Sequence, residues 1–293
     1  MSLKYEKKDI YSTLSQEELD NANGYAKSYM NFLDKARTEY LAVEEAVAIL
    51  EMNGFISLEE KEVLEPGDRI YFINKDKSLY VAVIGNENIV NGLNIVGAHI
   101  DSPRLDLKPM PLIEKSGTAL FKTQYYGGIK AYQWMSIPLA MYGVIYNKNG
   151  EKIKVAIGEQ DEDPVFTIAD LLPHLAKDQM KKNANEFIDP EKMSVLVGSL
   201  KDKEATDKDT EKVKQNILKI LNDKYGIDEI DFARSEISFV PAFKTKFIGL
   251  DRGLIGGYGQ DDRVCAYATI RAIIDAADEL GDTIRKTAIA MIV

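Results

Sequence analysis

The stretch over residues 94–109, NIVGAHIDSPRLDLKP, constrains the fold more than any other part of the chain. An apolar run over 93–98 leads directly into His99 and Asp101, and Ser102-Pro103 then breaks it. Short apolar runs that end in such breakers are typical of strands buried on both faces. We therefore expect a central strand of an open α/β sheet, with polar residues at the end where such sheets bind ligands.

Two of these polar residues form a pair that suits metal binding. His99 and Asp101 are two positions apart, so both point to the same side of an extended backbone. A metal-binding imidazole usually donates its second N–H to a carboxylate, which fixes the tautomer of the ring. The pair can supply both the ligand and that carboxylate, although a structural histidine followed by an Asp-Ser-Pro turn gives the same pattern.

The composition excludes several classes of protein. The 293 residues suffice for two domains or one large one, and 45% hydrophobic with 29% charged residues is ordinary for a globular protein. The formal charge of -10 disfavours nucleic acid and anionic membranes as partners. Cys265 is the only cysteine, and no secretory signal or membrane-spanning apolar stretch is visible, so we expect a cytoplasmic location.

The order of the predicted elements indicates an α/β domain that is interrupted by a second domain. We expect helices from a capping box at Ser15, over 40–50, 167–182 and 263–280, and strands over 69–74, 79–84, 93–98 and 287–293. The segment over 112–240, between the first three of these strands and the last helix, is rich in short predicted strands. The first domain would therefore comprise 1–111 and 241–293, with 112–240 inserted and a parallel strand after the last helix.

A second polar cluster, GGYGQDDR over residues 256–263, precedes the last predicted helix. Helix capping explains its Asp261 and Asp262 adequately, because aspartate favours the first turn of a helix. A phosphate loop is a poor fit, because two aspartates repel phosphate and the P-loop lysine is absent. Combined with His99 and Asp101, however, the pair predicts an imidazole and carboxylates at one sheet edge, as in a two-metal hydrolase.

The sequence resembles the M18 zinc aminopeptidases, the family of aminopeptidase I and aspartyl aminopeptidase. The motifs HIDSPRL and LKP over residues 99–109, YGGI over 126–129 and DDRVC over 261–265 occur in the family's order. The resemblance implies a mixed-sheet, phosphorylase/hydrolase-like catalytic domain that is interrupted by a mostly β dimerisation domain. It also implies a metal-dependent exopeptidase that hydrolyses the N-terminal residue from peptides, in dimers that assemble to a dodecamer.

The resemblance also implies roles for single residues. His99 would bind one zinc ion, Asp101 would orient its imidazole, and Asp261 would bridge two zinc ions, with manganese or cobalt as alternatives. A cis peptide bond would join Asp261 to Asp262. His174, the only other histidine, would reach the active site of a neighbouring subunit and help to hold the substrate, although a histidine on a helix surface is the simpler interpretation.

Two features depart from the family pattern. The segment over 130–139, KAYQWMSIPL, lacks the Arg-Asp pair of aspartyl aminopeptidases, which places the chain closer to the aminopeptidase I branch. The catalytic glutamate, a glutamate ligand, and a later aspartate and histidine would lie beyond Val293, so we expect the chain to be truncated in its catalytic domain. A non-catalytic oligomeric protein with this fold and a metallohydrolase acting on another amide are the alternative functions.

Overall fold

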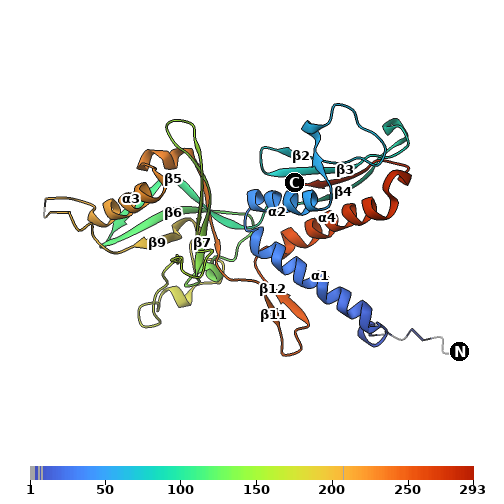
Figure 1. Ribbon diagram of the computed structural model, residues 1–293. Helices are drawn as coiled ribbons and strands as arrows, with labels where there is room; N and C mark the ends of the chain where they lie inside the picture. Colours follow the sequence, from blue (N-terminus) through green and yellow to red (C-terminus); the bar gives the residue numbers. More distant parts are fainter. Residues whose placement is uncertain (1–3, 6, 8, 207) are drawn as a thin grey trace.

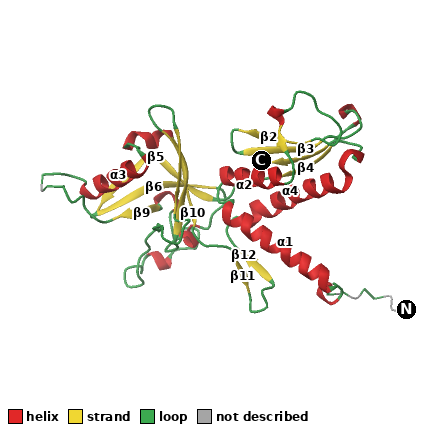
Figure 2. Ribbon diagram, in the orientation of Figure 1, coloured by secondary structure: helices red, strands yellow, loops and turns green. Residues whose placement is uncertain are grey.

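Two β-sheets, each with its own apolar core, organise the chain into two lobes (Figure 1). The computed structural model describes residues 4–293 except 6, 8 and 207. Helices and strands of both ends of the chain build one lobe, and the middle of the chain builds the other, in which strands predominate (Figure 2). The architecture is therefore mixed α/β, as the sequence predicts.

The sheet of the first lobe carries the strand that ends at His99. In sheet order its strands are β1 (Ile56–Ser57), β2 (Arg69–Asn74), β3 (Ser78–Val83), β13 (Ala288–Ile292) and β4 (Asn94–Ala98). Strand β13 pairs with β3 in antiparallel and with β4 in parallel fashion. The strand after the last helix thus returns beside the strand that ends at His99, which confirms the predicted parallel connection.

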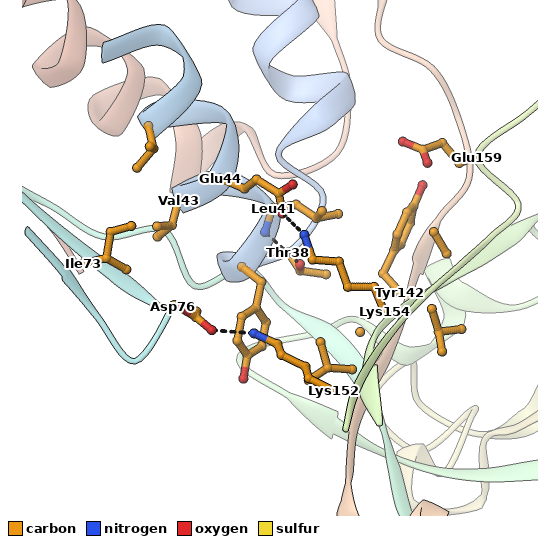
Figure 3. Close-up of a pocket in the computed structure, with 16 residues that line it drawn as sticks. Thr38, Leu41, Val43, Glu44, Ile73, Asp76, Tyr142, Lys152, Lys154 and Glu159 are labelled. Atoms are coloured by element: carbon orange, nitrogen blue, oxygen red, sulfur yellow. Dashed lines mark hydrogen bonds and ion pairs between the residues drawn. The ribbon is translucent and has the colours of Figure 1, made fainter. Parts of the chain in front are cut away.

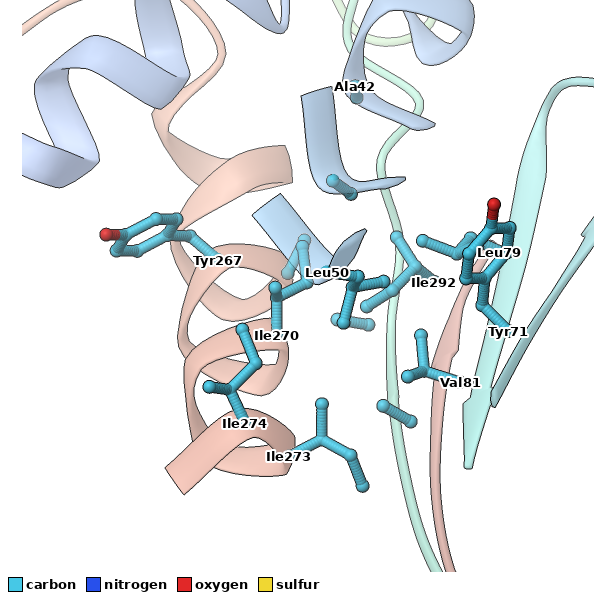
Figure 4. Packing of buried hydrophobic residues seen from close by; sticks show 14 of the residues in the cluster. Ala42, Leu50, Tyr71, Leu79, Val81, Tyr267, Ile270, Ile273, Ile274 and Ile292 are labelled. Carbon is cyan, nitrogen blue, oxygen red and sulfur yellow. The ribbon is translucent and has the colours of Figure 1, made fainter. Parts of the chain in front are cut away.

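Three helices pack on this sheet: α1 (Gln16–Lys35), α2 (Glu39–Met52) and α4 (Gln260–Leu280). The capping box that predicts α1 is present, because the N–H of Ser15 donates to Glu18 at 2.8 Å and Ser15 Oγ accepts the N–H of Glu18 at 3.3 Å. Isoleucines of α4 face Leu50 of α2 and the sheet residues Val81 and Ile292 (Figure 4). Burial of this apolar face fixes the start of α4 relative to β4.

The second lobe contains a six-stranded antiparallel sheet. In sheet order its strands are β8 (Lys152–Ile157), β7 (Leu139–Tyr146), β10 (Ser235–Pro241), β5 (Arg104–Lys115), β6 (Thr118–Tyr126) and β9 (Ser194–Gly198). Helix α3 (Lys212–Tyr225) covers part of it, and the ring of Phe121 packs against Phe232 and Phe239 in its core.

The remaining elements are short. The hairpin of β11 (Lys246–Ile248) and β12 (Leu254–Gly256) projects from the junction of the lobes (Figure 1). The 3-10 helices are Ile10–Ser12, Leu58–Glu60, Ile89–Asn91, Ala131–Trp134, Gln179–Lys181, Pro190–Lys192, Glu229–Arg234 and Gly281–Thr283. None of the described helices combines the length and apolar character needed to span a bilayer.

The long strand β5 was not predicted, because two prolines stand in its middle. Pro109 and Pro111 remove backbone donors, which normally excludes them from a paired central strand. The register between β5 and β6 shifts between Leu107 and Leu112, so both prolines fall in a bulge where no ladder pairs form. The bulge allows one strand to continue through a sequence that signals a break.

The prediction of a helix over residues 167–182 is wrong. Turns and the 3-10 helix Gln179–Lys181 occupy this segment, and Thr167 forms a bridge to Leu196 instead. Pro173 lacks a backbone N–H and its ring disfavours the preceding helical turn, so a regular helix cannot run through this position.

The prediction that β4 is buried on both faces is also wrong. Ile95 and Val96 are 54% and 57% exposed, and β4 has β13 as its only neighbour among the described residues. A strand at the edge of a sheet keeps an open side whatever its composition, so an apolar sequence alone does not establish burial.

A hollow lies where the two lobes meet (Figure 3). This cavity of about 340 Å³ is lined by α2, the turn after β2, and strands β7 and β8. Ion pairs from Lys152 to Asp76 and from Lys154 to Glu44 connect the lobes across it. None of the polar residues at the end of β4 lines this cavity, so it is separate from the site described next.

Candidate metal centre

The end of β4 and the start of α4 meet in three dimensions. His99 follows β4 directly, and Asp261 and Asp262 lie in the first turn of α4. One ligand atom from each of the three side chains can be chosen so that all lie within 4.8 Å of one another. The structure thus places His99 beside Asp261 and Asp262, although the whole second lobe separates them along the chain.

Asp101 also contacts the imidazole, at the nitrogen Nδ1. Its Oδ1 lies 3.3 Å from Nδ1 of His99, and its Oδ2 accepts a hydrogen bond of 2.6 Å from the hydroxyl of Tyr126. Burial raises the pKa of Asp101, but hydrogen bonds from Tyr126, a backbone N–H and His99 outweigh it and hold the pKa below its usual value. The anionic carboxylate can therefore accept the Nδ1–H of His99 and leave Nε2 free for a cation.

The aspartates differ in exposure and neither caps the helix. Asp262 is 5% exposed with Oδ1 at 3.7 Å from Nδ1 of His99, whereas Asp261 is exposed. The N-cap is Gly259, with φ of 77° and no side-chain hydrogen bond, so neither aspartate is the N-cap, but both lie in the first turn, where the helix dipole favours carboxylates as the alternative explanation expects. One imidazole nitrogen and carboxylate oxygens are a donor set that zinc accepts, so these residues fit a zinc-type cation.

Arg263 holds the two halves of this site together. It is fully buried, its Nε donates to the carbonyl of Ala36 at 2.9 Å, and its Nη1 donates to the carbonyl of Ile100 and, at 2.9 Å, to Oγ of Ser102. Burial lowers the pKa of Arg263. The nearby charges of Tyr258 and Asp262 act to raise the pKa but do not outweigh the effect of burial. The residue fastens the start of α4 to the segment that carries His99.

His174 lies apart from this group. It is exposed, in a turn of the second lobe, and it is not one of the residues that could hold a metal ion with His99 among those described. The peptide bond between Asp261 and Asp262 is trans, contrary to the expectation of a cis bond. The trans form is the ordinary one for a bond that does not precede proline.

The sequence alone assigned no role to Tyr126 or Arg263 and none as a metal ligand by itself to Asp262, although all three stand in the motifs. Tyr126 ends strand β6, and its contact with Asp101 spans 25 positions of the chain. The contacts of Arg263 span 161 positions or more. Motif position alone could mark these residues as candidates, but only the fold shows what they touch.

A mixed α/β sheet with an imidazole and carboxylates gathered at a strand end is typical of metal-dependent hydrolases. A model of the family described as aminopeptidase I zinc metalloprotease (M18) matches residues 32–293. The chain therefore belongs to the M18 family.

Individual relatives agree with this assignment. The probable M18 family aminopeptidase 1 of Borrelia garinii subsp. bavariensis is 44% identical over 288 residues, and that of Thermotoga maritima is 45% identical over 277. The matches cover 98% and 94% of this chain but 61% and 59% of the relatives, so the chain spans about three fifths of their length. A probable M18 family aminopeptidase 2 of Ectopseudomonas mendocina is 27% identical over 257 residues.

Solved structures share the fold. The Thermotoga maritima M18 aminopeptidase superposes with a TM-score of 0.89 at 43% identity, over 99% of this chain and 61% of the other. The S. cerevisiae mApe1 dodecamer superposes with a TM-score of 0.71 at 19% identity, over 93% and 60%. The mixed α/β architecture is thus that of M18 aminopeptidases.

Proposed function

We propose that the full-length protein is a metal-dependent aminopeptidase that releases the N-terminal residue from peptides. The observation that carries this proposal is the group of His99, Asp261 and Asp262, whose ligand atoms lie within 4.8 Å of one another. Membership of the M18 family supports zinc as the metal and peptides as the substrates.

The side chains of this site have distinct roles in the proposal. His99 would hold zinc, for which manganese and cobalt are alternatives, with Asp101 accepting the hydrogen of its Nδ1, and Asp261 would be the carboxylate ligand shared between two such ions. Zinc bound there would polarise the scissile carbonyl and acidify a water molecule. A glutamate outside this sequence would serve as general base in the full-length protein and move a proton to the leaving amine.

We also propose that residues 112–240 form an inserted dimerisation domain within a catalytic domain of 1–111 and 241–293. The separate sheet and core of the second lobe support an insertion, but strand β5 (Arg104–Lys115) belongs to that sheet, so in the structure the second lobe begins at Arg104 and not at residue 112. Dimers that assemble to a dodecamer, in the cytoplasm, complete the proposal, and the mApe1 dodecamer provides a precedent for the assembly within the fold.

In this proposal activity requires the oligomer, because His174 would reach the active site of a neighbouring subunit and help to hold the substrate. Its turn is exposed, and Leu171, Leu172 and Leu175 around it are 53%, 67% and 72% exposed. A group of exposed leucines is typical of a surface that another chain covers.

The test is a panel of aminoacyl chromogenic substrates and short peptides, each with a free and with an acetylated N-terminus. The proposal predicts turnover of free N-termini alone, and the panel identifies the preferred residue. Hydrolysis of acetylated peptides at the same rate would indicate a different metallohydrolase, and absence of all turnover in the metal-loaded protein would indicate a non-catalytic one.

A further inference from the structure

The carboxylate of Asp101 is held at both of its oxygens. Oδ1 faces Nδ1 of His99 at 3.3 Å, and Oδ2 accepts the hydroxyl hydrogen of Tyr126 at 2.6 Å. A carboxylate that is fixed at one oxygen presents the other in a defined direction, and this direction sets the tautomer and the orientation of the imidazole. We propose that Tyr126 is a positioning residue of the metal centre that acts through Asp101; this inference rests on the proposed metal site.

The ring of Tyr126 is itself fixed by Arg104. The guanidinium lies over the ring at 4.0 Å from its centre, and it forms ion pairs with Glu39 at 2.6 Å and Asp106 at 2.8 Å. Burial lowers the pKa of Arg104, but the charges of Glu39 and Asp106 outweigh it and keep the pKa above its usual value. A permanently charged group that is held on three sides restricts the motion of the ring beneath it.

This network brings the second lobe to the metal centre. Tyr126 is the last residue of β6 and pairs in register with Arg104, the first residue of β5. Glu39 is the first residue of α2 in the other lobe. The orientation of His99 therefore depends on the second lobe and on its docking against α2, and not on β4 alone.

If the hydroxyl of Tyr126 had a purely structural role, its removal would lower the stability of the fold. Tyr126 is 38% exposed, and a hydrogen bond at such a position contributes little to folding, because water replaces it when the protein unfolds. Removal of the hydroxyl should therefore change the geometry of the site more than the stability of the fold.

The experiment measures zinc affinity of the full-length protein by competition with a chromogenic chelator. We expect Tyr126→Phe to weaken zinc binding about tenfold, with an unchanged melting temperature of the metal-free protein. The matched control is Tyr125→Phe, because Tyr125 is similarly exposed at 42% and points to the opposite face of β6. Equal zinc affinity of Tyr126→Phe and wild type would overturn the inference.

A double variant shows whether the hydroxyl acts through Asp101. In an Asp101→Ala background, Tyr126→Phe should cause no further loss of zinc affinity, whereas an additive loss would overturn the proposed route. Peptide turnover is recorded separately. Wild type that binds zinc without hydrolysing peptides refutes the aminopeptidase and leaves this inference standing, and failure of wild type to bind zinc refutes both.

Discussion

At the scale of single residues, one buried side chain joins the two sequence clusters of the site. Arg263 is 0% exposed and donates to Ala36, Ile100 and Ser102. These acceptors lie on segments far from α4 in the sequence, and Ser102 is itself 2% exposed. Loss of the guanidinium would leave buried oxygens without their donors, which costs more than loss of a surface contact.

We expect Arg263→Met to lower the free energy of unfolding by about 3 kcal/mol. The control is Arg271→Met on the same helix, where the arginine forms an exposed pair with Asp275 at 3.4 Å, and its loss should cost less than about 0.5 kcal/mol. Urea denaturation of the metal-free proteins measures both values. Equal losses for the two variants would show that Arg263 does not join the segments.

Residues of the site differ in how far the sequence could predict them. His99 and Asp101 could be selected because their spacing and residue types indicate chemistry locally, whereas the metal role of Asp261 came from the family resemblance. Tyr126 and Arg263 could not, because a tyrosine at a strand end and an arginine in a helix have many uses. Their roles depend on contacts that form only when distant segments pack.

At the scale of elements, the sequence predicts those helices and strands that local signals define. Tertiary contacts decide the elements that it does not predict correctly. The capping box at Ser15 and the polar turn after residue 74 place α1 and β2 correctly, because each signal acts within a few residues. Strand β5 escapes prediction because a bulge accommodates its prolines, and β4 is more exposed than its composition suggests because it lies at a sheet edge.

Close approach of β7 and β10 makes one glycine irreplaceable. Gly143 has φ of 149°, and a Cβ there would lie 1.9 Å from the carbonyl oxygen of Glu236. We expect Gly143→Ala to destabilise the protein by about 3 kcal/mol or more, because the backbone strands must separate. Gly24→Ala, in the open middle of α1, should stabilise by up to about 1 kcal/mol. Thermal unfolding of both variants checks the opposite signs.

The loop after β8 should make stability depend on pH. Asp163 accepts backbone hydrogen bonds from Gln160, Gly158 and Glu159, and these lower its pKa below the ordinary 3.8. Because the folded-state pKa is depressed, the contribution is present above the unfolded pKa and is lost as pH falls through the folded one.

We therefore expect Asp163→Ala to lower the melting temperature at pH 7 and to have progressively less effect below about pH 4. Asp161→Ala is the control, because Asp161 is 85% exposed in its pair with Lys244 and should have little effect at either pH. Calorimetry at a series of pH values distinguishes them. A difference for Asp163→Ala that stays constant down to pH 2 would contradict the assignment.

At the scale of the whole molecule, the two lobes are parts of one site. The second lobe supplies Tyr126 to Asp101 and Arg104 to Glu39, so the metal centre lies where the lobes are coupled. The sequence predicts an insertion because its pattern of helices and strands changes twice along the chain. It could not predict this coupling, because the coupling depends on the pairing of β5 with β6, and the prolines in β5 make its sequence look unlike a strand.

The proposed role of His174 in a neighbouring subunit predicts complementation. His99→Ala and His174→Ala should each be nearly inactive alone. Mixed subunits should regain activity at about one site in four, because a site with an intact His99 can then receive an intact His174 from its neighbour. Co-expression of the two variants, followed by turnover measurement on the mixed oligomer, checks this. Activity no greater than that of the separate variants would place His174 outside the neighbouring site.

The central claim is that His99 and Asp261 bind the metal on which aminopeptidase activity depends. The most direct measurement is release of the N-terminal residue by the full-length protein after chelation and again during stepwise addition of zinc. We predict that chelation abolishes turnover, that zinc restores it, and that His99→Gln responds to neither treatment. Turnover that survives chelation, or zinc restoration that is equal in His99→Gln and wild type, would contradict the account.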